Sequence, residues 1–207
     1  ALQIISSEKK DSFLYSKEFS HMKLIERYNE FLNYSVKRKQ KLIKVIKDNK
    51  NRKKILIFPS GQFEYKIWPY YINLIKLLKE VENFEISLLA ANKNELNEFK
   101  SFSSEKIKLI HGQSLAKVET LINNNDLVIA NDSGPKHLTS LCKKTCLSID
   151  GYFSSWTTSS YCNNSFSVFS SGFNAKTFFS RRLRYKSLKQ ISPEFIFEFV
   201  LLYLNYF

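Results

Sequence analysis

Short apolar runs alternate with helical segments from about residue 50 onward, and this alternation limits the possible folds more than any other feature. The runs at 54–58, 84–90, 107–110, 126–130 and 145–149 consist mostly of apolar residues. Strands that are buried on both faces have this composition, and helices between such strands favour parallel pairing. The sequence therefore predicts an α/β fold, with a Rossmann-like parallel sheet that carries helices on both faces.

Residue spacing predicts the other elements. Apolar residues at helical spacing predict helices at 21–34, 68–81, 94–102, 114–123, 135–143 and 192–206, and a further strand is predicted around 166–169. Residues 1–20 show little pattern and are expected to form an irregular lead-in. The chain begins at Ala1 rather than Met, so we expect it to be cut from a longer protein.

The chain carries a formal net charge of +13, and its basic residues gather at 37–54 and 181–189. Such an excess favours an anionic partner, which can be nucleic acid, acidic lipid or a phosphorylated ligand. The alternative is a solvated surface, the usual state of a charge run. Aromatic residues beside lysines can stack on nucleic-acid bases. Most aromatics here fall on predicted core faces, so we expect no nucleic-acid partner.

Cysteine usage and hydropathy bear on the compartment. The three cysteines, Cys142, Cys146 and Cys162, form no paired metal-binding motif and no disulfide framework. No apolar run reaches the roughly 20 residues that a membrane span needs, and the first residues lack a signal-peptide pattern. We therefore expect a cytoplasmic protein without a metal site.

The most informative local feature is residues 127–138, where a strand, a tight turn and a helix start follow one another. Asp132 or Ser133 can cap the helix, and Pro135 suits its first turn. Gly134 permits close approach to the backbone. The N–H groups of a helix start attract anions, and ligands of open α/β sheets bind at this edge. The alternative is an ordinary capped helix without a ligand.

A second turn follows the strand that ends at residue 58. Ser60 and Gly61 can present hydroxyl and N–H groups to a phosphate, and Lys66, just before Trp-Pro, can neutralise its charge. The alternative for a lone lysine is exposure to solvent.

Together, these two segments resemble glycosyltransferase family 9, which includes the ADP-heptose:lipopolysaccharide heptosyltransferases. The family shows Lys-x-Trp-Pro at a helix start and, later, Asn-Asp-Ser-Gly-x-x-His-Leu after a strand. The chain has both in that order, at 66–69 and 131–138. Residues 191–194 resemble the start of the family's last helix, and residues 21–32 resemble the segment between its two domains. The resemblance covers about residues 20–207.

The resemblance implies the C-terminal half of a glycosyltransferase B fold, the half that holds the nucleotide-sugar donor. Residues 1–49 are then expected to be a linker and interdomain helix left from a missing N-terminal domain. Residues 50–207 are expected to be the Rossmann-like donor-binding domain.

The resemblance also implies roles for single residues. Lys66 and Asp132 are expected to be catalytic: Lys66 contacts the donor diphosphate, and Asp132 meets donor hydroxyls or fixes the turn. His137 reaches phosphate or buttresses the turn, and Glu95 lies near the nucleoside ribose. The expected donor site comprises Ser60, Gly61, Lys66, Glu95, Asp132, Ser133, Gly134 and His137.

The chemistry implied is an inverting transfer without a metal ion or cofactor, from a nucleoside-diphosphate sugar such as ADP-heptose to a lipopolysaccharide-core or similar glycan. Lysine and helix N–H groups stabilise the leaving diphosphate. The general base is a carboxylate of the N-terminal domain. The expected partners are this donor, a lipid-linked glycan acceptor and, through the basic clusters, the anionic inner face of the inner membrane.

The chain departs from the family pattern at three places. Residues 143–146 stand where the family commonly has a Gly-Thr-Pro segment before its next strand. Lys136 stands at a usually apolar position, and we expect it to add positive charge near the phosphate site. Asp150 begins a segment where the family often has Phe-Gly-Pro-Thr, so the sugar stays open. The alternative function is a truncated or degenerate remnant that at most binds nucleotide and transfers nothing.

Overall fold

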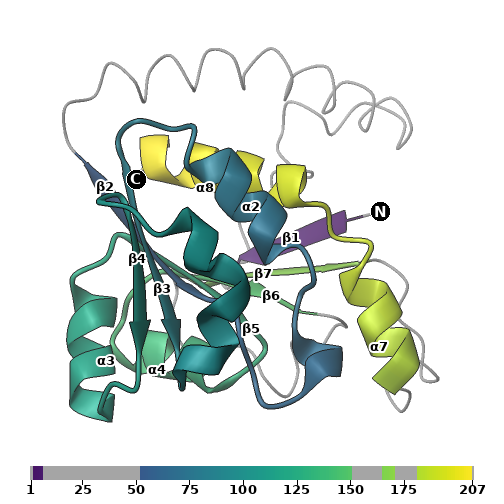
Figure 1. The fold of residues 1–207 in the computed structure, drawn as a ribbon. Coiled ribbons are helices and arrows are strands. Elements are labelled where there is room, and N and C mark those ends of the chain that lie inside the picture. The colour runs from purple at the N-terminus through teal and green to yellow at the C-terminus, as the bar shows by residue number, and fades with distance from the viewer. Residues whose placement is uncertain (1, 7–51, 151–164, 171–180, 207) are drawn as a thin grey trace.

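A computed structural model describes residues 2–6, 52–150, 165–170 and 181–206 (Figure 1). The predicted helix at 21–34, nearly all of the first basic run and Cys162 lie outside these residues. The predicted division at residue 49 lies outside them as well and stays a prediction.

One seven-stranded sheet organises the described residues, in the order β1-β7-β6-β5-β2-β3-β4. The strands are β1 (Leu2–Ser6), β2 (Lys53–Phe58), β3 (Phe84–Ala90), β4 (Ile107–His111), β5 (Leu127–Asn131), β6 (Cys146–Ile149) and β7 (Ser165–Ser170). All neighbours from β7 to β4 pair in parallel, and β1 pairs antiparallel with β7 at the edge. The predicted parallel sheet is therefore confirmed.

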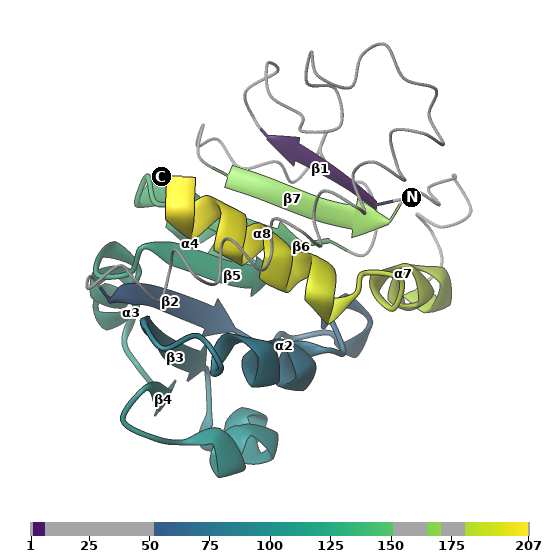
Figure 2. The same ribbon diagram turned by 90° about the horizontal axis from the view of Figure 1, so that it is seen from above.

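Helices cover both faces of the sheet, as predicted (Figures 1 and 2). The α-helices are α2 (Tyr71–Leu78), α3 (Leu115–Asn123), α4 (Gly134–Leu141), α7 (Arg181–Leu188) and α8 (Pro193–Tyr206), and the 3₁₀ helices are η3 (Glu64–Lys66) and η4 (Lys93–Phe102). α2 and α8 pack on one face, and α3 and α4 pack on the other. Among the described residues, we find no helix with the length and apolar character that crossing a membrane would require.

Strand β2 shows how the two faces divide the core. Ile55 and Ile57 pack into the cluster under α2 and α8, whereas Leu56 and Phe58 pack into the cluster under α3 and α4. All four side chains are buried. Because successive residues of a strand point to opposite faces, a strand buried on both sides is apolar without alternation.

Three local predictions differ from the structure. Residues 2–6 form strand β1 rather than an irregular lead-in, because they pair with β7, a partner more than 150 positions away in the sequence. Residues 181–188, identified only as a basic cluster, form helix α7. The helix predicted from residue 68 begins at Tyr71, since the preceding Trp-Pro segment belongs to the turn that leads into it.

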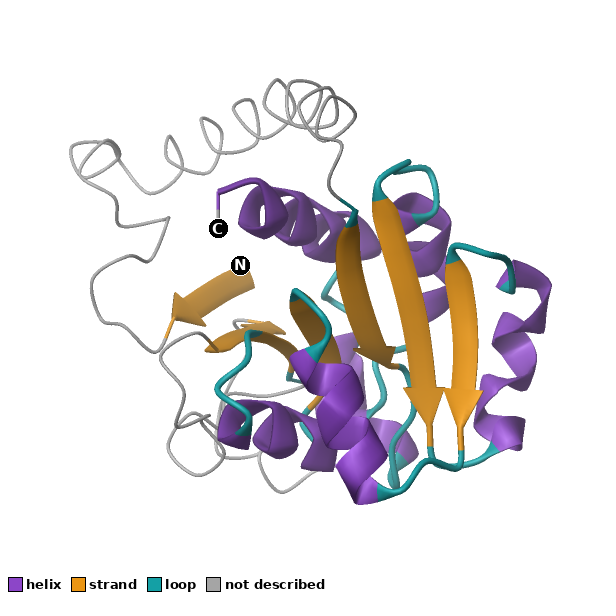
Figure 3. Cartoon of the chain, turned by 90° about the vertical axis from the view of Figure 1, so that its left-hand side faces the viewer, coloured by secondary structure: helices purple, strands orange, loops and turns teal. Residues whose placement is uncertain are grey.

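The order of the strands creates a switch point. From β2 the chain adds β3 and β4 on one side, and then crosses back to add β5, β6 and β7 on the other. Figure 3 shows neighbouring strands running in one direction, so that their carboxyl ends meet at one edge of the sheet. In open α/β sheets the crevice outside the carboxyl ends at such a point binds ligands. Here it lies between the ends of β2 and β5.

Candidate functional site

The two turns singled out in the sequence meet at this switch point. The turn after β2 carries Lys66, and the turn after β5 carries Asp132. The Lys66 Nζ lies 3.3 Å from Asp132 Oδ2 and 3.5 Å from the Asp132 carbonyl oxygen. The two turns therefore lie together at one edge of a single sheet. Lys66 keeps 28% of its side chain exposed, so the lysine is partly accessible to solvent at this edge.

Asn131, the last residue of β5, joins the two turns. Its side-chain oxygen accepts hydrogen bonds from the Trp68 backbone N–H and the Tyr71 hydroxyl, both at 3.0 Å. Its amide nitrogen donates to the backbone carbonyls of Phe58 and Ser60, at 3.4 and 3.3 Å. The sequence alone indicates no role for Asn131. The only signal available was a polar amide at the end of a buried apolar strand.

The Tyr71 hydroxyl is a dependable donor to Asn131. Burial, and after it the nearby Cys146 and Asp150, raise the pKa of Tyr71 well above its ordinary value. The hydroxyl therefore stays protonated at neutral pH, and both polar groups of the Asn131 amide are matched without a charge.

Replacing Asn131 with alanine is expected to lower the free energy of unfolding by about 2–4 kcal/mol, because the Trp68 N–H and the Tyr71 hydroxyl lose a buried acceptor. Urea unfolding followed by circular dichroism measures the change. Asn97→Ala, at an exposed position in η4, is the matched control and should shift the free energy by less than about 0.5 kcal/mol. Equal effects of the two substitutions would contradict this role for Asn131.

Trp68 fixes the position of the turn that holds Lys66. It is 1% exposed, and its indole Nε1 donates to the Ile191 carbonyl at 2.9 Å, just before α8. Its ring meets those of Tyr70 and Tyr71 edge-on, with centroids 5.8 and 5.2 Å apart. The Lys-x-Trp-Pro segment therefore places a buried anchor two residues beyond an accessible lysine.

Lys136 differs from expectation. Its side chain is 1% exposed, and its Nζ lies 3.1 Å from Asp132 Oδ1 and 3.4 Å from Asp150 Oδ2. The Ser148 hydroxyl donates a further bond to Asp150. The prediction that Lys136 adds free positive charge at a phosphate site is wrong, because two carboxylates surround its ammonium group.

The protonation states in this cluster follow from burial and charge. Burial opposes ionisation of Asp132, but the ammonium groups of Lys136 and Lys66 outweigh it and hold the pKa of Asp132 below its ordinary value. Burial likewise opposes the charge of Lys136, and Asp150 and Asp132 outweigh it, so the pKa of Lys136 is raised. For Asp150, burial prevails over the charge of Lys136 and raises the pKa. Of the two carboxyl groups, Asp132 is therefore the one that stays ionised more firmly.

The start of α4 faces the same edge. Ser133 takes the N-cap position in an extended conformation, but its hydroxyl donates to the Asn131 carbonyl at 3.2 Å instead of capping the helix. A Cβ added to Gly134 would meet no described atom within 4 Å, and Gly134 does not need a positive φ. The glycine therefore leaves open space beside N–H groups that a helix start cannot pair internally.

The remaining predicted residues lie nearby without joining the charged cluster. Ser60 is half-buried and Gly61 exposed in the turn after β2. Glu95 accepts hydrogen bonds from the Ala91 N–H and the Asn92 side chain, at the carboxyl end of β3. His137 is exposed on α4.

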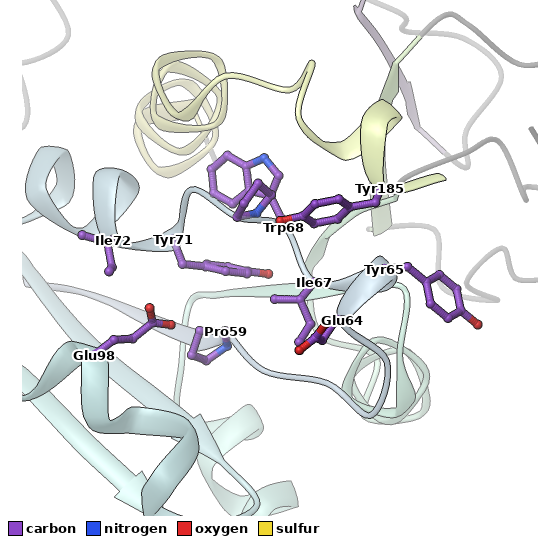
Figure 4. A pocket seen from close by; sticks show the side chains of 10 residues that line it. Pro59, Glu64, Tyr65, Ile67, Trp68, Tyr71, Ile72, Glu98 and Tyr185 are labelled. Atoms are coloured by element: carbon purple, nitrogen blue, oxygen red, sulfur yellow. The ribbon is translucent and has the colours of Figure 1, made fainter. Parts of the chain in front are cut away.

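A cavity of about 680 Å³ opens beside the turn after β2 (Figure 4). Its walls come from that turn, α2, η4 and α7, and they include Trp68 and Tyr185. Glu64 and Glu98 contribute carboxylates, whereas neither Lys66 nor Asp132 lines it. The described side chains that line it are therefore aromatic, apolar and acidic, and Lys66 lies outside this lining. No cluster of three or more metal-ligating side chains occurs among the described residues.

Comparisons with known proteins agree with this architecture. A lipopolysaccharide heptosyltransferase 1 of Campylobacter coli is 31% identical over 149 residues, which are 68% of this chain and 43% of that protein. Escherichia coli ADP-heptose lipopolysaccharide heptosyltransferase II matches with a TM-score of 0.62 at 19% identity, over 79% of this chain and 51% of that one. A glycosyltransferase family 9 structure from Veillonella parvula matches with a TM-score of 0.59 at 16% identity, over 83% and 52%.

The two structural matches show the shared fold, and the chain spans about half the length of these relatives or less. The model of glycosyltransferase family 9 (heptosyltransferase) matches residues 19–189, which include both turns and the helices that follow them. The chain therefore belongs to glycosyltransferase family 9, the heptosyltransferase family.

Proposed function

We propose that the chain supplies the donor site of a glycosyltransferase that takes a sugar from a nucleoside-diphosphate sugar. The observation that carries the proposal is the meeting of Lys66 with the start of α4 at the switch point of the sheet. Structures of Escherichia coli heptosyltransferase WaaC with ADP and with ADP-2-deoxy-2-fluoro heptose share the fold, which favours ADP-heptose as the donor.

The roles of Lys66 and α4 follow from the charge that develops during transfer. An acceptor hydroxyl attacks the anomeric carbon, the bond from that carbon to the diphosphate oxygen breaks, and a base takes the hydroxyl proton. The growing negative charge on the diphosphate meets the Lys66 ammonium and the N–H groups of Ser133 and Gly134. Donors fixed before the reaction stabilise such a charge most effectively.

The other site residues complete the proposal. Asp132 fixes Lys66 and contacts donor hydroxyls, while Glu95, after β3, contacts the nucleoside ribose. Ser60 and Gly61 line the turn beside the diphosphate. His137, exposed one turn into α4, reaches the phosphate or buttresses the turn. The base is a carboxylate contributed from outside residues 50–207.

Replacing Lys66 with methionine is expected to weaken ADP binding about 10- to 150-fold, the effect of losing a charge-assisted hydrogen bond of about 1.5–3 kcal/mol. Isothermal titration calorimetry on the 207-residue chain measures it. Lys76→Met removes an equal charge from an exposed position on α2 and is expected to change the affinity less than twofold. If the Lys66 variant folds and binds ADP as tightly as wild type, Lys66 does not contact the donor diphosphate.

Transfer itself is tested separately. Because the proposed base lies outside the donor domain, the 207-residue chain is expected to bind ADP-heptose without transferring heptose to a lipid A-type acceptor. Mass spectrometry of the acceptor after incubation measures the product. Measurable product would contradict this placement of the base, and loss of nucleotide binding would support the reading of the chain as a non-functional remnant.

The acceptor and the place of action are also proposals. A lipopolysaccharide-core or similar lipid-linked glycan fits the family, and the net charge of +13 favours a peripheral contact with anionic lipid on the cytoplasmic side of the membrane. Sedimentation with anionic vesicles, compared with neutral ones, tests the contact. Equal sedimentation with both would exclude it.

A further inference from the structure

Lys136 and Asp150 form a buried ion pair directly behind the donor edge. The two side chains are 1% and 5% exposed, with Nζ 3.4 Å from Oδ2. Both stand where the family resemblance leads one to expect apolar residues, so two departures from the pattern contact each other. Taking charges out of water is expensive unless they are paired, and such a pair contributes little net stability. Stability alone therefore does not explain why a charged pair is buried at this position.

Asp132 connects this pair to the donor edge. Its carboxylate is shared between two lysines: Oδ1 lies 3.1 Å from Lys136 Nζ, and Oδ2 lies 3.3 Å from Lys66 Nζ. A lysine paired with a carboxylate of its own would form a neutral pair with little attraction for an anion. Lys136 on the other oxygen gives Asp132 a second positive partner, and Lys66 is the member of this group that reaches solvent.

We infer that Lys136 is a positioning residue that neutralises Asp132 and thereby leaves the Lys66 ammonium available to the diphosphate of the donor. Asp150 competes with Asp132 for the Lys136 ammonium. The strength of the Lys136–Asp150 contact therefore determines how strongly Asp132 attracts Lys66. This inference rests on the proposed function, because it needs Lys66 to face an anion. It adds a chain of ion pairs, here called the relay, that runs from Asp150 through Lys136 and Asp132 to Lys66.

The relay predicts effects of opposite sign for two neighbouring substitutions. Lys136→Met leaves Asp132 with Lys66 alone, so Lys66 is held more tightly and ADP binding should weaken about tenfold or more. Asp150→Asn leaves Lys136 with Asp132 alone, so Lys66 is released and ADP binding should become about threefold tighter. A purely structural pair would weaken ADP binding in both variants, because each loses a buried partner.

Calorimetric titration of the 207-residue chain with ADP tests the relay, with Lys76→Met as the control for a lost surface charge. In the double variant Lys136→Met/Asp132→Asn, the unneutralised carboxylate is gone, so its affinity should return to within about threefold of that of Asp132→Asn alone. If Lys136→Met unfolds, Lys136→Met/Asp150→Asn replaces it, because this variant removes both members of the buried pair and should also bind ADP about tenfold more weakly.

Two results would overturn the inference: an affinity of Lys136→Met, or of its Asp150→Asn double variant, within twofold of wild type, or equal weakening by Lys136→Met and Asp150→Asn. Failure of the proposed function looks different. In that case Lys66→Met leaves ADP binding unchanged, whatever the Lys136 variants do.

Discussion

The free energy of unfolding of the Lys136→Met variant is expected to be about 3–5 kcal/mol lower than that of the wild-type chain. This is the usual effect of removing one partner from a buried ion pair. Asp132 keeps Lys66, but among the described side chains Asp150 keeps only hydroxyl groups such as that of Ser148 as partners. A natural domain is stable by about 5–15 kcal/mol, so the variant loses a large part of its stability. Urea unfolding at pH 7 measures the loss.

A second variant separates the lost charge from the lost packing. Lys136→Met/Asp150→Asn removes both charges of the pair and should be more stable than Lys136→Met alone, although it contains one more substitution. If the loss of unfolding free energy in the double variant equals the sum of the losses in the two single variants, the two residues do not interact energetically.

The destabilisation should also depend on pH, with a sign that the carboxyl groups fix. Burial raises the pKa of Asp150 already in wild type, and Lys136 opposes that rise, so its loss moves this pKa further upward. A carboxyl whose folded pKa lies above the unfolded value of about 3.9 stabilises the fold by binding a proton, and this contribution is lost as pH rises. The stability gap between Lys136→Met and wild type should therefore narrow from pH 7 to pH 5. A constant gap would contradict the buried charge as its cause.

Trp68→Ala is expected to lower the free energy of unfolding by about 3–5 kcal/mol, because it removes the largest side chain that is fully buried among the described residues and leaves a cavity. It also leaves the Ile191 carbonyl without the indole donor. Trp68→Phe keeps an aromatic ring against Tyr71 and should lose only about 1–2 kcal/mol. Thermal and urea unfolding measure both variants.

Phe63→Ala is the matched control for Trp68, since this aromatic residue of the same turn is 43% exposed. Its unfolding free energy should change by less than about 1 kcal/mol. A Trp68→Ala variant no less stable than Phe63→Ala would show that Trp68 does not anchor the turn. Because the anchor lies two residues from Lys66, weakened ADP binding should accompany the loss of stability.

The parallel sheet could be predicted from the sequence because each of its buried strands is recognisable alone. Strand β2 is apolar at every position from Ile55 to Phe58, whichever face the residue meets. Strand β1 could not be predicted, since residues 2–6 become a strand only through pairing with β7. No residue pattern within 2–6 indicates that distant partner.

The site divides in the same way. Lys66 and Asp132 could be predicted because they lie in turns at the carboxyl ends of predicted parallel strands, which must meet at one edge. The role of Asn131 depends on Trp68 and Tyr71, which lie 63 and 60 positions earlier in the chain. The burial of Lys136 depends on Asp150, and lysine is almost never buried without such a partner. An acidic residue at the end of the next strand was the one available signal.

A crystal structure of the chain with bound ADP tests the central claim most directly. We expect a phosphate oxygen within hydrogen-bonding distance of Lys66 Nζ and of the backbone N–H groups at Ser133 and Gly134, outside the ends of β2 and β5. ADP seated in the aromatic cavity beside Tyr185, with Lys66 still bound only to Asp132, would contradict it.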